Sequence, residues 1–171
     1  MKHILILNGS PRKNGKTASL VNAFCEGARE SGNEVVDLYL DSMNIHGCKA
    51  CEACRKNGGN CVQRDQMVEV YEAVERADVV VFASPMYWGS VTGQLKVVVD
   101  RLYAECNKGG LENFGSFMKE TAFIMTARGN YYEDALDFYH IFTRIMGWKD
   151  WGQVLGAGHE EEARALGAHI K

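Results

Sequence analysis

The sequence lacks the features that would direct a chain to nucleic acid or to a membrane. Its formal net charge is −3, so no positive field gathers nucleic acid or anionic lipid around it. No apolar run approaches the length that spans a bilayer. The apolar start is too short, and too soon interrupted by polar residues, for a signal sequence. We therefore expect a cytoplasmic protein that binds neither nucleic acid nor membrane.

The sequence also lacks internal repeats, low-complexity tracts and any stretch typical of a linker between domains. Its 171 residues, 46% of them apolar, can build one well-packed domain but are too few for two of ordinary size. We expect a single domain over residues 1–171. Short apolar runs alternate in it with longer amphipathic stretches, as in a parallel sheet whose strands are covered by helices.

This alternation predicts five strands and five helices. The strands are expected at residues 3–8, 34–40, 78–84, 121–126 and 151–155, and the helices at 17–31, 65–76, 93–107, 133–146 and from Glu160 onward. Asp37 interrupts the second strand, as an edge strand tolerates, whereas the very apolar run 78–84 suits the sheet centre. The fold class is therefore α/β, with a doubly wound five-stranded parallel sheet and helices on both faces. Such folds bind ligands at the carboxyl ends of their strands.

The loop after the first strand, Gly9-Ser-Pro-Arg-Lys-Asn-Gly-Lys-Thr17, carries hydroxyls, backbone amides and the start of a helix, which can together surround a phosphate. An ordinary turn with helix capping is the alternative. A nucleotide-binding P-loop is disfavoured, because Ser10 holds the position of its first glycine and Gly9 comes one residue too early. The dinucleotide fingerprint G-x-G-x-x-G is also absent there. A mononucleotide phosphate fits better.

The loop after the third strand contains Met86, Tyr87 and Trp88, at the place where a doubly wound sheet presents its ligand. These side chains offer a surface for a flat apolar ring. Alternatively, they pack beneath a loop or against another subunit. Together with the phosphate loop they favour flavin mononucleotide (FMN).

Four of the six cysteines lie close together, in the spacing Cys48-x2-Cys51-x2-Cys54-x6-Cys61. Thiolates are soft ligands, and a compressed C-x2-C-x2-C run is more typical of an iron-sulfur cluster than of a structural zinc site. Zinc and plain reduced thiols remain alternatives. His46, beside the run, is expected to be solvated, and Cys25 and Cys106 to be core residues.

At this point the chain resembles a known family. The first loop, the cysteine run followed by Arg64-Asp65-Gln66-Met67, and the stretch from Ser84 to Arg101 are similar to the flavodoxin-like NAD(P)H-dependent FMN reductases, particularly their iron-sulfur flavoprotein branch. The resemblance implies a flavodoxin-like FMN-binding domain with a cysteine-rich loop at about residues 46–64. It also implies a homodimer or a dimer of dimers.

Matching positions imply the cofactor contacts. The FMN phosphate is assigned to the first loop, and the ribityl chain and ring to the two later loops: Ser10, Arg12, Asn14 and Thr17; then Pro85, Met86, Tyr87, Trp88 and Gly89; then Thr126, Arg128 and Gly129. Lys16, where relatives commonly have a smaller polar residue, is expected either to add a phosphate contact or to point to solvent. A [4Fe-4S] cluster is assigned to Cys48, Cys51, Cys54 and Cys61.

These features predict an FMN-dependent oxidoreductase. The flavin N5 accepts hydride from NAD(P)H, so no acid or base side chain is required and no catalytic residue is assigned. Electrons from NAD(P)H or a reduced carrier would pass to a small acceptor or a partner redox protein. An electron-transfer module without NAD(P)H oxidase activity is the alternative.

Overall fold

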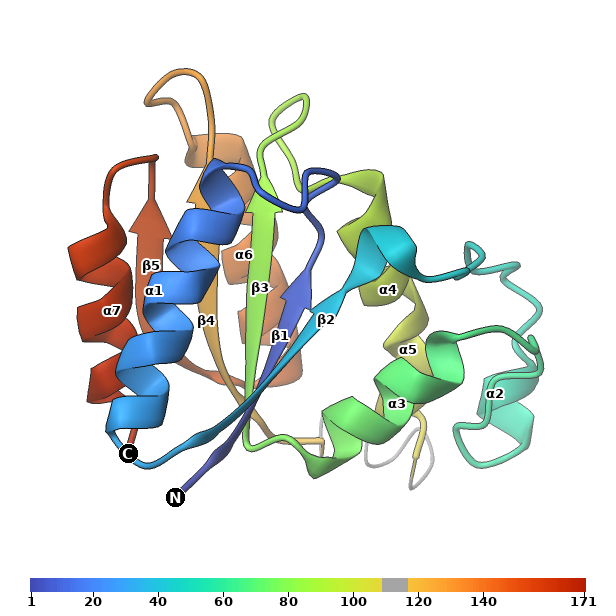
Figure 1. Ribbon diagram of the computed structural model, residues 1–171. Coiled ribbons are helices and arrows are strands. Elements are labelled where there is room, and N and C mark those ends of the chain that lie inside the picture. Colours follow the sequence, from blue (N-terminus) through green and yellow to red (C-terminus); the bar gives the residue numbers. More distant parts are fainter. Residues whose placement is uncertain (109–116) are drawn as a thin grey trace.

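The computed structural model describes residues 1–108 and 117–171, which form a parallel sheet covered by helices on both faces (Figure 1). The strands are β1 (His3–Asn8), β2 (Glu34–Tyr39), β3 (Val79–Pro85), β4 (Glu120–Thr126) and β5 (Lys149–Leu155). Their order is β2-β1-β3-β4-β5, and every neighbouring pair is parallel. This confirms the predicted flavodoxin-like fold, with β2 at an edge and β3 at the centre.

Two hydrophobic layers hold the sheet between its helices. On one face, α1 (Lys16–Glu30) and α7 (Glu160–His169) cover side chains such as Ile4, Ile6 and Val81 (Figure 1). On the other face, α3 (Met67–Arg76), α4 (Gly93–Arg101) and α6 (Glu133–Met146) cover the alternate side chains, such as Leu7 and Phe82. Because successive side chains of a strand point to opposite faces, both sets are buried. Cys25 and Cys106 are each 4% exposed, which confirms their prediction as core residues.

The helix expected over 93–107 is interrupted in the structure. It is divided at Leu102 into α4 and the short α5 (Tyr103–Cys106). At this point the Leu102 N–H is shared between the carbonyls of Val98 and Val99, and the Arg101 carbonyl accepts a hydrogen bond from the Tyr71 hydroxyl (3.1 Å). The structure adds two short elements, η1 (Leu40–Ser42) and α2 (Ala53–Lys56), to the predicted ones. The segment that carries α2 and the cysteines lies at the β2 side of the molecule, away from the sheet (Figure 1). No helix in the described part of the chain combines the length and apolar character needed to cross a bilayer.

Candidate functional site

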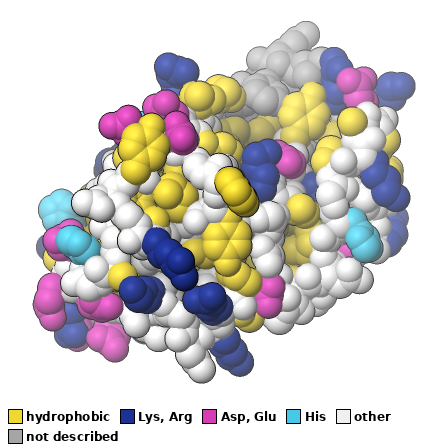
Figure 2. All heavy atoms as spheres, turned by 90° about the horizontal axis from the view of Figure 1, so that it is seen from above, with side chains coloured by type: hydrophobic (Ala, Val, Ile, Leu, Met, Phe, Trp, Pro, Cys, Tyr) yellow, Lys and Arg dark blue, Asp and Glu magenta, His cyan; other side chains and the backbone are white. Residues whose placement is uncertain are grey.

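The carboxyl ends of β1, β3 and β4 meet at a cavity of about 490 Å³, within the range of cofactor sites. Figure 2 views this end of the molecule, where hydrophobic side chains lie beside lysines and arginines. Most of the predicted cofactor-binding residues line the cavity, together with Pro11, Gly15 and Ala127: Ser10, Arg12, Lys16, Thr17, Pro85, Met86, Tyr87, Thr126, Arg128 and Gly129. Asn14, Trp88 and Gly89 do not line it. The structure thus brings together three loops that are far apart in the sequence.

Side chains within the first loop fix its shape. The Ser10 hydroxyl accepts a hydrogen bond from the Arg12 amide (3.2 Å) and donates one to the Arg12 carbonyl (3.1 Å). The Ser10 amide donates to the Asn8 side-chain oxygen (3.2 Å). Gly15 precedes α1 and has no side chain to cap the helix, so the first amides of α1 are left to another acceptor. With the exposed Arg12 and Lys16 beside them, these amides favour an anion.

A buried hydrogen bond joins the first loop to the end of β4. The hydroxyl oxygens of Thr17 and Thr126 lie 2.8 Å apart, and the two residues are 2% and 5% exposed. Both line the cavity. The position of α1 relative to β4 is therefore set by a polar contact inside the site.

Gly9 lets α4 approach the first loop closely. A Cβ atom at this position would lie 2.6 Å from Leu95 Cβ and 2.8 Å from Thr92 Oγ1. The Thr92 hydroxyl donates to the Gly9 carbonyl (2.7 Å) and accepts from the Leu95 amide, which caps α4. Sequence reasoning assigned no role to Thr92, although a threonine directly before an amphipathic run is a typical helix cap. The contact fixes the N-terminus of α4 against the first loop.

Trp88 and Gly89 form the tip of a tight turn beside the cavity. Tyr87 and Ser90 exchange backbone hydrogen bonds of 2.8 and 3.0 Å, while Trp88 and Gly89 have φ values of 51° and 72°. Two central residues with positive φ are characteristic of a type I′ hairpin turn. This geometry directs the Trp88 side chain into solvent, where it is fully exposed. In this structure Trp88 therefore lies outside the cavity that it was predicted to line.

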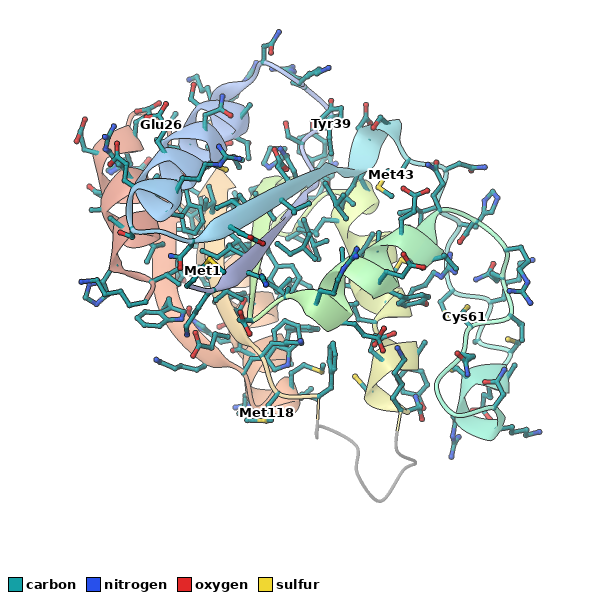
Figure 3. The ribbon with its side chains drawn as sticks, turned by 60° about the horizontal axis from the view of Figure 1, so that its bottom comes forward. Met1, Glu26, Tyr39, Met43, Cys61 and Met118 are labelled. Atoms are coloured by element: carbon teal, nitrogen blue, oxygen red, sulfur yellow. The ribbon has the colours of Figure 1, made fainter. Side chains whose placement is uncertain are left out.

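The four clustered cysteines line a second, smaller cavity of about 210 Å³. Cys48 and Cys51 are exposed, and Cys54 and Cys61 are half-buried. Between the first three cysteines the backbone turns at Ala50 (φ 50°) and Glu52 (φ 54°), in the left-handed region that costs non-glycine residues energy. Figure 3 labels Cys61, which lies in the segment between α2 and α3. This loop is thus bent so that all four cysteines border one space.

A buried ion pair lies behind Cys61. The Arg101 guanidinium pairs with the Asp65 carboxylate and donates to the Cys61 sulfur (3.5 Å). Burial alone would raise the pKa of the Cys61 thiol, but hydrogen bonds from the Gln63 backbone and from Arg101 outweigh it and lower the pKa. For Cys54, burial dominates and raises the pKa. Cys61 therefore has the more favourable environment for a thiolate.

The cysteine cavity has the soft thiol donors that an iron-sulfur cluster needs. Within residues 1–108 and 117–171, no group of three or more His, Cys, Asp or Glu side chains could hold a metal ion. A [4Fe-4S] cluster has four irons and four cysteine ligands, so its thiolates surround a space instead of converging on one atom. Four cysteines around one cavity fit that requirement, and zinc remains the alternative. The assignment of these cysteines as ligands stays a prediction.

Comparison with known proteins defines the family. The NADPH-dependent FMN reductase model matches residues 2–158, so the chain belongs to this family. An iron-sulfur flavoprotein of Archaeoglobus fulgidus is 41% identical over 102 residues, which are 60% of this chain and 46% of that protein. A second iron-sulfur flavoprotein of the same organism is 32% identical over 140 residues, 74% of this chain and 68% of that protein. The chain thus spans about half the length of the first relative.

Solved structures agree with the fold. The NAD(P)H:quinone oxidoreductase from Methanothermobacter marburgensis superimposes with a TM-score of 0.75 at 20% identity, covering 99% of this chain and 96% of that one. At this identity the likeness supports the flavodoxin-like fold alone. The predicted family and fold are both confirmed.

Proposed function

We propose that this protein is an FMN-dependent oxidoreductase that passes electrons from NAD(P)H or a reduced carrier to a small acceptor or a redox protein. The observation that carries the proposal is the cavity at the carboxyl ends of β1, β3 and β4, where an anion-binding loop faces Met86 and Tyr87. Membership of the NADPH-dependent FMN reductase family supports the same assignment.

In this proposal the FMN phosphate lies at the start of α1. The Ser10 turn fixes the shape of the loop, the free helix amides and the hydroxyl of Thr17 provide hydrogen-bond donors, and Arg12 and Lys16 provide positive charge. Met86 and Tyr87 form an apolar wall for the ring, and Thr126, Arg128 and Gly129 border the cavity on the β4 side. Bound FMN supplies the hydride acceptor, so the protein only binds, orients and shields it.

We further propose that Cys48, Cys51, Cys54 and Cys61 hold a [4Fe-4S] cluster. Support comes from their shared cavity and from the relatives named iron-sulfur flavoproteins. Such a cluster supplies one-electron transfer next to two-electron flavin chemistry. A homodimer or dimer of dimers is part of the proposal, and the exposed side chains of Tyr87, Trp88 and Tyr131 offer surface for such a contact.

The first experiment is anaerobic purification, followed by an absorption spectrum and by iron, acid-labile sulfide and FMN determinations. The proposal expects flavin bands, and about four irons and four sulfides per chain. Flavin without iron, even after reconstitution, would refute the proposed cluster but not the proposed FMN site. Absence of FMN binding would refute both the FMN site and the proposed oxidoreductase function.

A matched pair of variants tests the phosphate site. Thr17→Ala should weaken FMN binding about tenfold, the effect of losing one hydrogen bond to a charged group. Ser19→Ala, an exposed hydroxyl on the same helix, should leave FMN affinity unchanged. If both variants bind FMN as tightly as the parent protein does, the phosphate does not bind at Thr17.

The alternative, an electron-transfer module without NAD(P)H oxidase activity, is favoured by the exposed aromatic tip. Tyr87 is 46% exposed and Trp88 fully exposed at the mouth of the cavity, a surface suited to a protein partner. Steady-state oxidation of NADH and NADPH with a quinone acceptor separates the two functions. Turnover supports the enzyme, whereas reduction by ferredoxin alone supports the carrier.

A further inference from the structure

Arg101 is a buried charge with an unusual set of partners. It is the last residue of α4 and only 2% exposed. Nη1 pairs with the Asp65 carboxylate, whose side chain is 1% exposed, and also donates to the His46 carbonyl (3.1 Å). Nη2 donates to Cys61 Sγ (3.5 Å). The guanidinium therefore connects a buried carboxylate with one of the four clustered thiols.

The positive end of the Arg101–Asp65 ion pair faces Cys61. Asp65 is bound at Nη1 and Cys61 at Nη2, so the cationic nitrogen, and not the carboxylate, contacts the sulfur. Arg101 also lines the cavity that the four cysteines share. Its Nε is buried and finds no hydrogen-bond partner among the residues that the structure describes.

We propose that Arg101 is a positioning residue that holds Cys61 at the cavity and raises the reduction potential of the cluster bound there. This inference rests on the proposed [4Fe-4S] site. One-electron reduction adds one negative charge to a cluster, and hydrogen bonds to its sulfurs set its potential. A fixed cation that donates to a ligand sulfur stabilises the more negative, reduced form. Asp65, the partner of that cation, has the opposite sign and opposes the effect from further away.

The test is a redox titration of the reconstituted holoprotein, followed by electron paramagnetic resonance of the reduced cluster. Arg101→Gln should make the reduction equilibrium about tenfold less favourable, which is a potential lower by about 59 mV for a one-electron couple. Arg101→Lys keeps the charge and should lie between Arg101→Gln and the parent protein. Asp65→Asn should shift the potential in the opposite direction. Arg64→Gln removes an exposed charge from the same segment and should leave the potential unchanged.

Opposite shifts for Arg101→Gln and Asp65→Asn are the supporting result, because a purely structural disturbance would not reverse its sign. If a single variant unfolds, the double variant Asp65→Asn/Arg101→Gln leaves no unpaired charge and should still show a lowered potential. Bound FMN per chain and circular dichroism report its folding. A cluster retained in Arg101→Gln with an unchanged potential would overturn this inference alone. A parent protein that binds FMN but no iron would overturn the cluster proposal as well.

Discussion

The hydrogen bond between Thr17 and Thr126 makes a quantitative test of the cofactor cavity possible. Valine has nearly the shape of threonine, so Thr17→Val or Thr126→Val removes one hydroxyl without opening a large space. The remaining hydroxyl then stays buried, since the two residues are 2% and 5% exposed and bond to each other over 2.8 Å. Leaving such a group unpaired costs about 1–3 kcal/mol of unfolding free energy.

The double variant Thr17→Val/Thr126→Val tests whether the two hydroxyls bond to each other or contribute to stability independently. Replacing both partners leaves neither unpaired, so Thr17→Val/Thr126→Val should cost clearly less than the sum of the single variants. We expect an interaction energy of about 1 kcal/mol or more, typical of residues in direct contact. Urea unfolding of the FMN-free proteins measures it, provided that the slope with denaturant is the same in all four proteins.

FMN affinity should follow a different order from stability. In the proposed site the Thr17 hydroxyl donates to phosphate, so Thr17→Val and the double variant should both bind FMN about tenfold more weakly, about 1.4 kcal/mol. Thr126→Val should lose less, and quenching of flavin fluorescence gives the affinities. Additive stability losses would refute the hydrogen bond, and unchanged FMN affinity in Thr17→Val would refute the phosphate assignment.

Three further predictions concern the surroundings of the two cavities. Gly9→Ala places a Cβ 2.6 Å from Leu95 Cβ, so it should cost about 1–3 kcal/mol of unfolding free energy; an unchanged urea midpoint would argue against the close approach of α4. Trp88→Asn replaces a fully exposed residue at φ 51° by one that tolerates this conformation, so it should stabilise the monomer by about 0.5–1 kcal/mol at dilutions where the proposed dimer is dissociated; a lower melting temperature of the monomer would argue against backbone strain at this turn. Burial alone would raise the pKa of Asp65, but hydrogen bonds from Arg101 and two backbone amides lower it below the ordinary value of 3.8. The ionised Asp65 therefore stabilises the folded protein above about pH 4, and this contribution is lost as the pH falls through the lower pKa of the folded state. The stability difference between the parent protein and Asp65→Asn should therefore shrink below about pH 4 in urea titrations, and a constant difference would contradict the role of the charge.

The fold could be predicted because the strands have continuous apolar runs, such as Val79 to Ala83, that only a sheet covered on both faces can bury. The two features that differ from the prediction, the interrupted helix and the position of Trp88, depend on local backbone geometry that the apolar pattern does not reveal. The helix is interrupted at Leu102, next to an Arg101 carbonyl that accepts a hydrogen bond from the distant Tyr71, and Trp88 lies outside the cavity because the backbone turns with positive φ at two consecutive residues. An aromatic residue after a central strand predicts a ring contact, but not the direction of a hairpin tip.

That the first loop borders the cavity could be predicted for a different reason: its residues are consecutive and follow a strand whose carboxyl end must lie at the ligand edge. The contacts of Arg101 could not, since its side-chain partners Asp65 and Cys61 are 36 and 40 residues away. Its sequence neighbours show only the end of an amphipathic helix, where an arginine normally points to solvent and favours the negative end of the helix dipole. Only the three-dimensional arrangement shows that this arginine is buried.

Helix α4 connects the two cavities. At its start, Thr92 bonds to the Gly9 carbonyl of the cofactor loop, and at its end Arg101 bonds to Cys61. Nine residue steps at about 1.5 Å each put these contacts roughly 14 Å apart along one rigid element. Through these two hydrogen bonds, one buried and one part-buried, α4 joins the first loop to Cys61. In the proposed protein, α4 would therefore link the FMN loop and the cluster loop through one rigid element.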